Sequence, residues 1–104
     1  MMFGRRTEHP HSIPLAGHAG LDDQYHELAR FWVSTERSFV LVAPDVVQSP
    51  ALLGSLLVEC IHTAAAGYAA TGNITEEEAL NELWKGLDQE RSRLESLEHA
   101  GGAN

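Results

Sequence analysis

The sequence predicts a mostly α-helical α+β domain with about three helices and one short β-strand. Three observations support this prediction. Residues 49–71 are largely apolar or small, a helix-capping signal at Thr75 opens a second long helical pattern, and residues 39–43 form an apolar run that ends at a proline. The first two patterns are typical of helices, and the third is typical of a strand.

Length and composition limit the organisation of the chain. Its 104 residues fit one domain. We expect a flexible arm at residues 1–20, a compact domain at residues 21–98 and a disordered tail at residues 99–104. The arm contains several prolines and glycines and shows no periodic apolar face. Its histidines, including His9 and His11, are expected to be solvated rather than to bind metal, because a loop offers no fixed ligand geometry.

Charge excludes some classes of partner. Fifteen acidic residues against seven basic ones give a formal net charge of −8, which repels nucleic acid and anionic membrane surfaces. Cys60 is the sole cysteine, so no intrachain disulfide can form. The N-terminal residues lack the apolar run of a signal peptide. We therefore expect a cytoplasmic protein.

The first helix is predicted over residues 22–34, with Asp22 as its cap. Four apolar side chains recur there at the spacing of one helical face: Leu21, Tyr25, Leu28 and Trp32. Glu27 can pair with Arg30 on the opposite side. Trp32 and its aromatic neighbours, Tyr25 and Phe31, are expected in the core rather than on a ligand platform.

The strand predicted at residues 39–43 is apolar at every position, so both of its faces should be covered. Its backbone groups need a partner strand, and no second strand is evident in the sequence. Two partners remain open: the arm near Ile13, and the same strand of a second copy across a two-fold axis. We favour the second, which predicts a homodimer.

The central helix begins at Ser49, which can cap it, with Pro50 at its first position, and ends near Gly72. At 100° per residue it has a broad apolar side and a narrow polar stripe. The apolar side comprises Leu53, Leu57, Ile61, Ala64 and Tyr68, and the stripe comprises Ser55, Glu59, His62 and Ala66. Glu59 and His62 near its middle argue against a membrane-spanning segment. Cys60 points away from His62, which cannot serve it as a base, and is expected to be a buried, inert side chain.

Glu59, His62 and Tyr68 are the candidate ligand-binding residues. A carboxylate three residues before an imidazole can orient it and raise its pKa. Glu-x-x-His is also the ligand spacing of di-metal carboxylate bundles, but such a site needs further ligands from other helices. We predict no metal site, no cofactor and no catalytic residue.

The last helix is predicted to begin at Thr75 and Glu78, which can form a capping box. Leucines and one tryptophan then recur in an a/d-like pattern: Leu80, Leu83, Trp84, Leu87, Leu94 and Leu97. Charged residues interrupt this pattern from Glu90. The later leucines are therefore expected to meet a second chain.

Several of these segments resemble one bacterial family. They are ELARFW, SFVLVAP, CIHTAAAGY in the central helix and EALNELWKGLDQE in the last one. Together they are similar to the family named domain of unknown function 5076, over about residues 27–90. The resemblance matches Trp32, His62 and Tyr68 to residues of that family, and the chain departs from it at residues 46–49. The family has no assigned activity, so the resemblance implies no catalytic residue.

Two classes of function follow from the sequence. The first is a homodimeric protein-interaction or regulatory module without catalysis, whose protein partner is unidentified. The second is a small-ligand or metal-binding protein that uses the stripe of Glu59 and His62. An enzyme is not expected, because one histidine without a nucleophile and an orienting group does not make a catalytic set.

Overall fold

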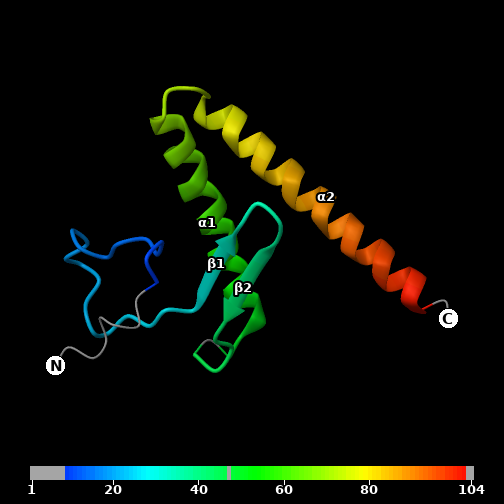
Figure 1. Cartoon of the computed structure of the whole chain (residues 1–104), viewed down its shortest axis with the longest axis horizontal. Coiled ribbons are helices and arrows are strands. Elements are labelled where there is room, and N and C mark those ends of the chain that lie inside the picture. The colour runs from blue at the N-terminus through cyan, green and yellow to red at the C-terminus, as the bar shows by residue number, and fades with distance from the viewer. Residues whose placement is uncertain (1–8, 47, 103–104) are drawn as a thin grey trace. The chain divides into compact units, whose positions relative to one another are not determined.

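A computed structural model describes residues 9–46 and 48–102 of the chain. Two strands are followed by two helices, β1 (Ala29–Val33), β2 (Ser38–Val42), α1 (Pro50–Ala70) and α2 (Glu76–Gly102) (Figure 1). The chain divides into two compact units, Met1–Val46 and Val47–Asn104. The first unit contains the strands and the second contains the helices. The fold is thus mixed α+β and mostly helical, as predicted, and the described residues form two helices instead of about three.

β1 and β2 form an antiparallel hairpin in which Ala29 pairs with Val42 and Val33 with Ser38. Ser34 organises the loop between them. Its backbone N–H donates to the carbonyl of Arg37 at 2.8 Å, and its hydroxyl oxygen accepts from the backbone N–H groups of Glu36 and Arg37. A Ser side chain that bonds nearby backbone groups in this way is typical of turns.

The prediction of a helix over residues 22–34 is wrong. Asp22 caps a turn instead, with its side chain accepting from the N–H of Gln24 at 3.0 Å and its carbonyl accepting from Tyr25. Residues 29–33 include Phe, Trp and Val, which favour strands, and the adjacent apolar strand offers them cross-strand partners. Pairing with β2 therefore outweighs the helical spacing of the apolar residues. Glu27 still pairs with Arg30, at 2.8 Å, as predicted.

The partner of the predicted strand is also corrected. The strand itself is confirmed, at Ser38–Val42, but it pairs with β1 of the same chain. Among the described residues it does not pair with the arm near Ile13, and pairing with a second copy stays a prediction. Because the sheet has two strands, each strand keeps one outer edge.

α1 begins as the sequence predicts. The Ser49 hydroxyl accepts from the N–H of Leu52 at 3.3 Å, and Pro50 occupies the first helical position. The helix ends at Ala70, and Gly72 adopts a φ of +83° just beyond it. That left-handed conformation is strained for residues with a Cβ, which explains the glycine at this position.

α2 begins with the predicted capping box. The Thr75 hydroxyl accepts from the N–H of Glu78, and the Glu78 carboxylate accepts from the N–H of Thr75, both at 3.0 Å. The helix continues to Gly102, beyond the predicted end near residue 98.

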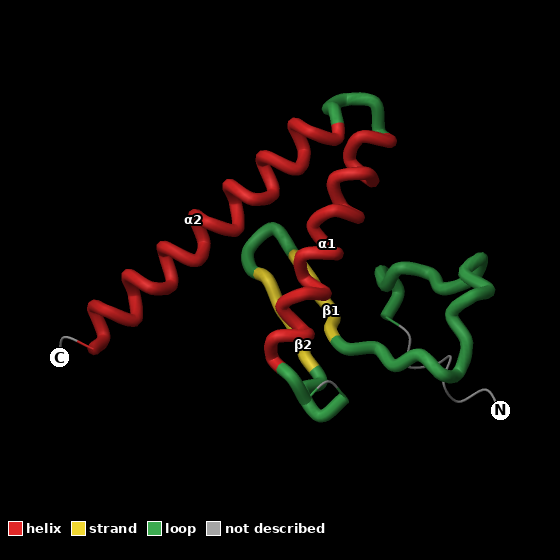
Figure 2. The backbone as a smooth tube through the Cα atoms, turned by 180° about the vertical axis from the view of Figure 1, so that it is seen from behind, coloured by secondary structure: helices red, strands yellow, loops and turns green. Residues whose placement is uncertain are grey.

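The two helices pack against each other close to the turn that joins them (Figure 2). Among the described side chains, those buried are Ile61 and Ala65 of α1 and Ala79 of α2. Two of the three are alanines, which allow the helices to approach closely. Farther from the turn several apolar side chains are exposed, among them Leu57 at 41%, Leu94 at 51% and Leu97 at 57%.

Candidate functional site

Glu59 and His62 lie on the exposed surface of α1. Their positions three residues apart place them about 60° apart around the helix axis. Ion pairs among the described residues join Glu27 to Arg30, Asp88 to Arg91 and Glu90 to Arg93, and none involves Glu59 or His62. The two side chains share one side of the helix without a bond between them.

His62 instead meets Trp84 of α2. The two ring centroids are 6.3 Å apart and the planes are inclined by 74°, an edge-to-face arrangement. This contact places the imidazole beside a side chain of the second helix. The sequence did not predict this contact. The two residues lie on different helices, and the contact depends on how the turn between the helices orients them.

Tyr68 lies on a different part of α1 from the other two candidates. Six residues after His62, it is about 9 Å farther along the axis and about 120° around it. It lines a recess of about 210 Å³ with Ile74, Ala79 and Leu83, together with Glu82. The structure thus brings Glu59 close to His62 but does not bring Tyr68 to them. Ligand binding by these residues stays a prediction.

Cys60 is exposed, which corrects the expectation that it is buried. It lies on a side of α1 that α2 does not cover. Among the described residues, no group of three or more His, Cys, Asp or Glu side chains is placed to hold a metal ion.

The perturbed carboxylates belong to structural contacts of α2. The pKa of Glu78 is lowered because its carboxylate accepts hydrogen bonds from the backbone and the side chain of Thr75. The pKa of Glu90 is lowered by its hydrogen bonds with Arg93, whose own pKa is raised by the same contact. A helix cap and an exposed ion pair account for these shifts without a catalytic role.

A second concave surface, which the sequence did not predict, lies between the arm and β1. We call it the arm recess. It measures about 280 Å³ and is lined by the arm residues His11, Ser12, Ile13 and Leu15, and by Glu27, Arg30, Phe31 and Trp32. The sequence does not indicate this surface, because the predicted helix places residues 27–32 in an element that faces the core.

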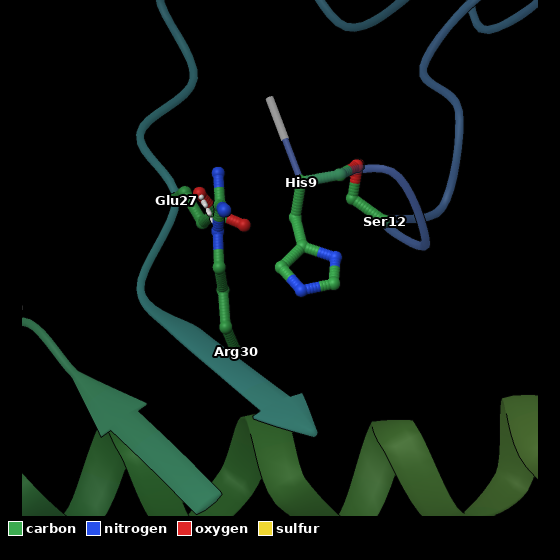
Figure 3. A network of polar contacts seen from close by, with 4 residues as sticks. All are labelled: His9, Ser12, Glu27 and Arg30. Atoms are coloured by element: carbon green, nitrogen blue, oxygen red, sulfur yellow. Dashed lines mark hydrogen bonds and ion pairs between the residues drawn. The ribbon is translucent and has the colours of Figure 1, made fainter. Parts of the chain in front are cut away.

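His9 holds the arm beside the hairpin (Figure 3). Its ring centroid lies 4.7 Å from that of Trp32, and its Nδ1 accepts from the backbone N–H of His11 at 3.0 Å. Its carbonyl accepts from the hydroxyl of Ser12 at 2.9 Å. Trp32 is consequently half-buried against a histidine rather than enclosed in a core. The other aromatic residues expected in the core, Tyr25 and Phe31, are 64% and 58% exposed.

α1 is also long and apolar enough, by length and composition, to cross a membrane, with a mean hydropathy of 1.3. The core helices of proteins in water pass the same test, so this is weak evidence for a span. Glu59 and His62 lie near the middle of the helix, where ionisable groups are costly in a bilayer.

Comparisons with known proteins place the chain in one family. No curated protein and no solved structure matches it. The family model described as domain of unknown function (DUF5076) matches residues 13–94, which include both strands, α1 and most of α2. The resemblance seen in the sequence is thereby confirmed: this chain belongs to the DUF5076 family.

Proposed function

We propose that this chain is a cytoplasmic protein-interaction or regulatory module that works as a homodimer and carries out no catalysis. The observation that carries the proposal is the hairpin, whose apolar side chains are exposed on both faces. An isolated two-stranded hairpin is marginally stable in water at best, and three or more strands or a covering element are needed for independent stability.

The alternation of side chains along the strands defines the two faces. Residues 29, 31, 33, 38, 40 and 42 share one face, and residues 30, 32, 39 and 41 share the other. On the first face Phe31 is 58% exposed and Val40 is 55% exposed, and on the second Phe39 is 59% exposed. Apolar surface of this kind on both sides of a sheet is typical of a protein that associates.

The helical unit supports the same proposal. Leu87, Leu94 and Leu97 of α2 recur at the spacing of one helical face and are at least 40% exposed. They follow the part of α2 that contributes Ala79 to the buried contact with α1. A second chain that covers them would complete an interface between helices.

Charge and site composition argue for protein rather than nucleic acid as the partner. The net charge of −8 opposes phosphate backbones. The candidate site also lacks a nucleophile paired with a base among the described residues, since Cys60 and His62 point to different sides of α1.

Native mass spectrometry of the untagged protein, with sedimentation velocity at micromolar concentrations, tests the proposal. A mass of two bare chains supports the homodimer. A protein that stays monomeric throughout that range contradicts it.

Ligand binding at Glu59 and His62 is the second candidate function. The observation in its favour is the contact of His62 with Trp84, which places an aromatic ring beside the imidazole. The same spectrum tests it: a bound small molecule or metal would add mass, and His62→Ala would remove that mass while leaving the helical circular dichroism unchanged. Added mass that survives the substitution contradicts this candidate.

A further inference from the structure

We infer that the outer edge of β2 is the seam of the homodimer: it pairs antiparallel with the same edge of a second copy, with Val40 opposite the partner's Val40 on a two-fold axis. The two hairpins then form one four-stranded sheet. The inference rests on the proposed homodimer and adds to it the surface, the orientation and the register.

Two hydrogen bonds at the ends of the hairpin show which backbone groups are free. The N–H of Ala43 donates to the carbonyl of Leu28, and the N–H of Ser34 donates to the carbonyl of Arg37, both at 2.8 Å. In an antiparallel pair, hydrogen-bonded and non-hydrogen-bonded positions alternate. With the observed register, Leu41 and Phe39 are therefore the β2 residues that bond to β1.

The remaining β2 residues, Ser38, Val40 and Val42, direct their N–H and C=O groups to the outer edge. Within the described part of the chain, no hydrogen bond is formed by these outward groups. Edge strands of monomeric proteins are usually protected by a lysine, a proline, a bulge or an inward charge. β2, with the sequence SFVLV and regular pairing, has none of these.

The outer side of β1 is different, because the described part of the arm, residues 9–20, lies on that side of the hairpin (Figures 1 and 2). The arm recess places His11, Ile13 and Leu15 beside Arg30, Phe31 and Trp32. A second copy would therefore meet arm residues before it reached the β1 edge. Within the unit Met1–Val46, this leaves β2 as the accessible edge.

A second copy fits this edge because the outward groups are symmetric about Val40. Antiparallel pairing about that residue places Ser38 opposite the partner's Val42 and forms about six backbone hydrogen bonds. The same operation keeps Val40, Val42 and Phe31 of both copies on one face of the sheet. Four strands exceed the minimum of three for a sheet that is stable by itself.

Charge at the two ends of β2 is complementary under the same two-fold axis. Arg37 precedes the strand and Asp45 follows it, and neither takes part in an ion pair among the described residues. Antiparallel pairing brings Arg37 to the end of the seam where the partner's Asp45 lies. The charges of the two copies therefore favour this orientation, whereas a parallel arrangement would place like ends together.

Proline substitution tests the seam through the backbone. Val40→Pro removes an N–H that the hairpin does not use but the seam requires, since proline is tolerated in edge strands where the N–H faces outward. Phe31→Pro is the matched control, because Phe31 pairs with Val40 and directs its own N–H to the β1 edge. We expect at least a 100-fold weaker dimer in sedimentation for Val40→Pro and a wild-type dimer for Phe31→Pro. A dimer that survives Val40→Pro, or equal loss in both variants, would overturn the inference.

Cross-linking tests the seam a second time with variants that leave the strand backbone intact. Replacing Cys60, the sole cysteine, with serine provides a background for single-cysteine variants. Val40→Cys should be converted to covalent dimer by a short bismaleimide, because the two residues face each other across the axis. Phe31→Cys, on the β1 edge, should remain largely uncross-linked, and equal yields at both positions would refute the seam.

The outcomes separate this inference from the proposed function. A monomeric wild-type protein refutes both. A wild-type dimer that tolerates Val40→Pro and gives no Val40→Cys cross-link refutes the seam alone and leaves the homodimer, with its interface on the helices.

Discussion

Replacing Ile61 with alanine tests whether the helical unit depends on the small contact near its turn. Ile61 is 9% exposed and lies in the contact formed with Ala65 and Ala79, which are 1% and 3% exposed. The substitution removes three carbon atoms, and each buried carbon contributes about 0.8 kcal/mol before any cavity is counted. We expect the free energy of unfolding to fall by about 2–4 kcal/mol.

Val58→Ala is the matched control on the same helix. It also shortens a β-branched side chain, but Val58 is 43% exposed, so the loss should be less than about 1 kcal/mol. Both substitutions replace a β-branched residue of α1 with alanine, so they change the helix propensity by similar amounts. The difference between the two variants therefore reports on packing.

Urea denaturation followed by Trp84 fluorescence measures the difference. Trp32→Phe should be present in all variants, so that the signal comes from the helical unit alone. Protein concentration must be fixed, because dimerisation would couple to stability. If Ile61→Ala and Val58→Ala destabilise equally, the helices do not pack at Ile61 and the assigned core is wrong.

Three further predictions concern the turn, the cap of α2 and the arm. Gly72→Ala should destabilise the protein by about 1 kcal/mol because Gly72 has a φ of +83°. Gly86 lies inside α2 with open space around it, so Gly86→Ala should stabilise the protein by about 0.5–1 kcal/mol. Thermal melts compare the two variants, and a change of the same sign in both would contradict the assigned backbone. Because Thr75 lowers the pKa of Glu78 below 4.5, the charged cap stabilises α2 at neutral pH, and this contribution is lost as the pH falls through the lowered pKa. The difference in melting temperature between wild type and Glu78→Gln should therefore narrow below about pH 4.5, and a constant difference would contradict the cap. Trp32→Ala should lower the free energy of unfolding by less than the roughly 3–5 kcal/mol typical of a fully buried aromatic residue, because Trp32 is half-buried against His9. If a urea titration gives a loss within that range, Trp32 lies in a core as the sequence predicts.

Local signals in the sequence predicted the helical unit well. Ser49 and Pro50 start α1, Gly72 lies in the turn after it, and Thr75 with Glu78 starts α2. Each signal acts within four residues, so it does not depend on the rest of the fold. The family assignment was likewise available from segments of the sequence.

The hairpin shows where local signals failed. Residues 22–34 carry helical spacing, and Glu27 pairs with Arg30 as a helix would allow, yet residues 29–33 form a strand. The competing stabilisation comes from residues 38–42, beyond the loop, which pair with residues 29–33 and supply the partner that a single strand lacks. Residues 34–37 form the loop that joins the two strands and brings them into register.

For the candidate site, the sequence placed Glu59 and His62 on one side of α1, because a helix fixes neighbours three residues apart. It could not determine that His62 meets Trp84, that Tyr68 lines a separate recess, or that Cys60 is exposed. These features depend on how α2 returns along α1 and on which side of the helix it leaves uncovered. Sequence alone determined caps, helix faces, the apolar strand and the family; the tertiary structure decided the partner of that strand, because strand pairing joins residues that local periodicity treats as independent.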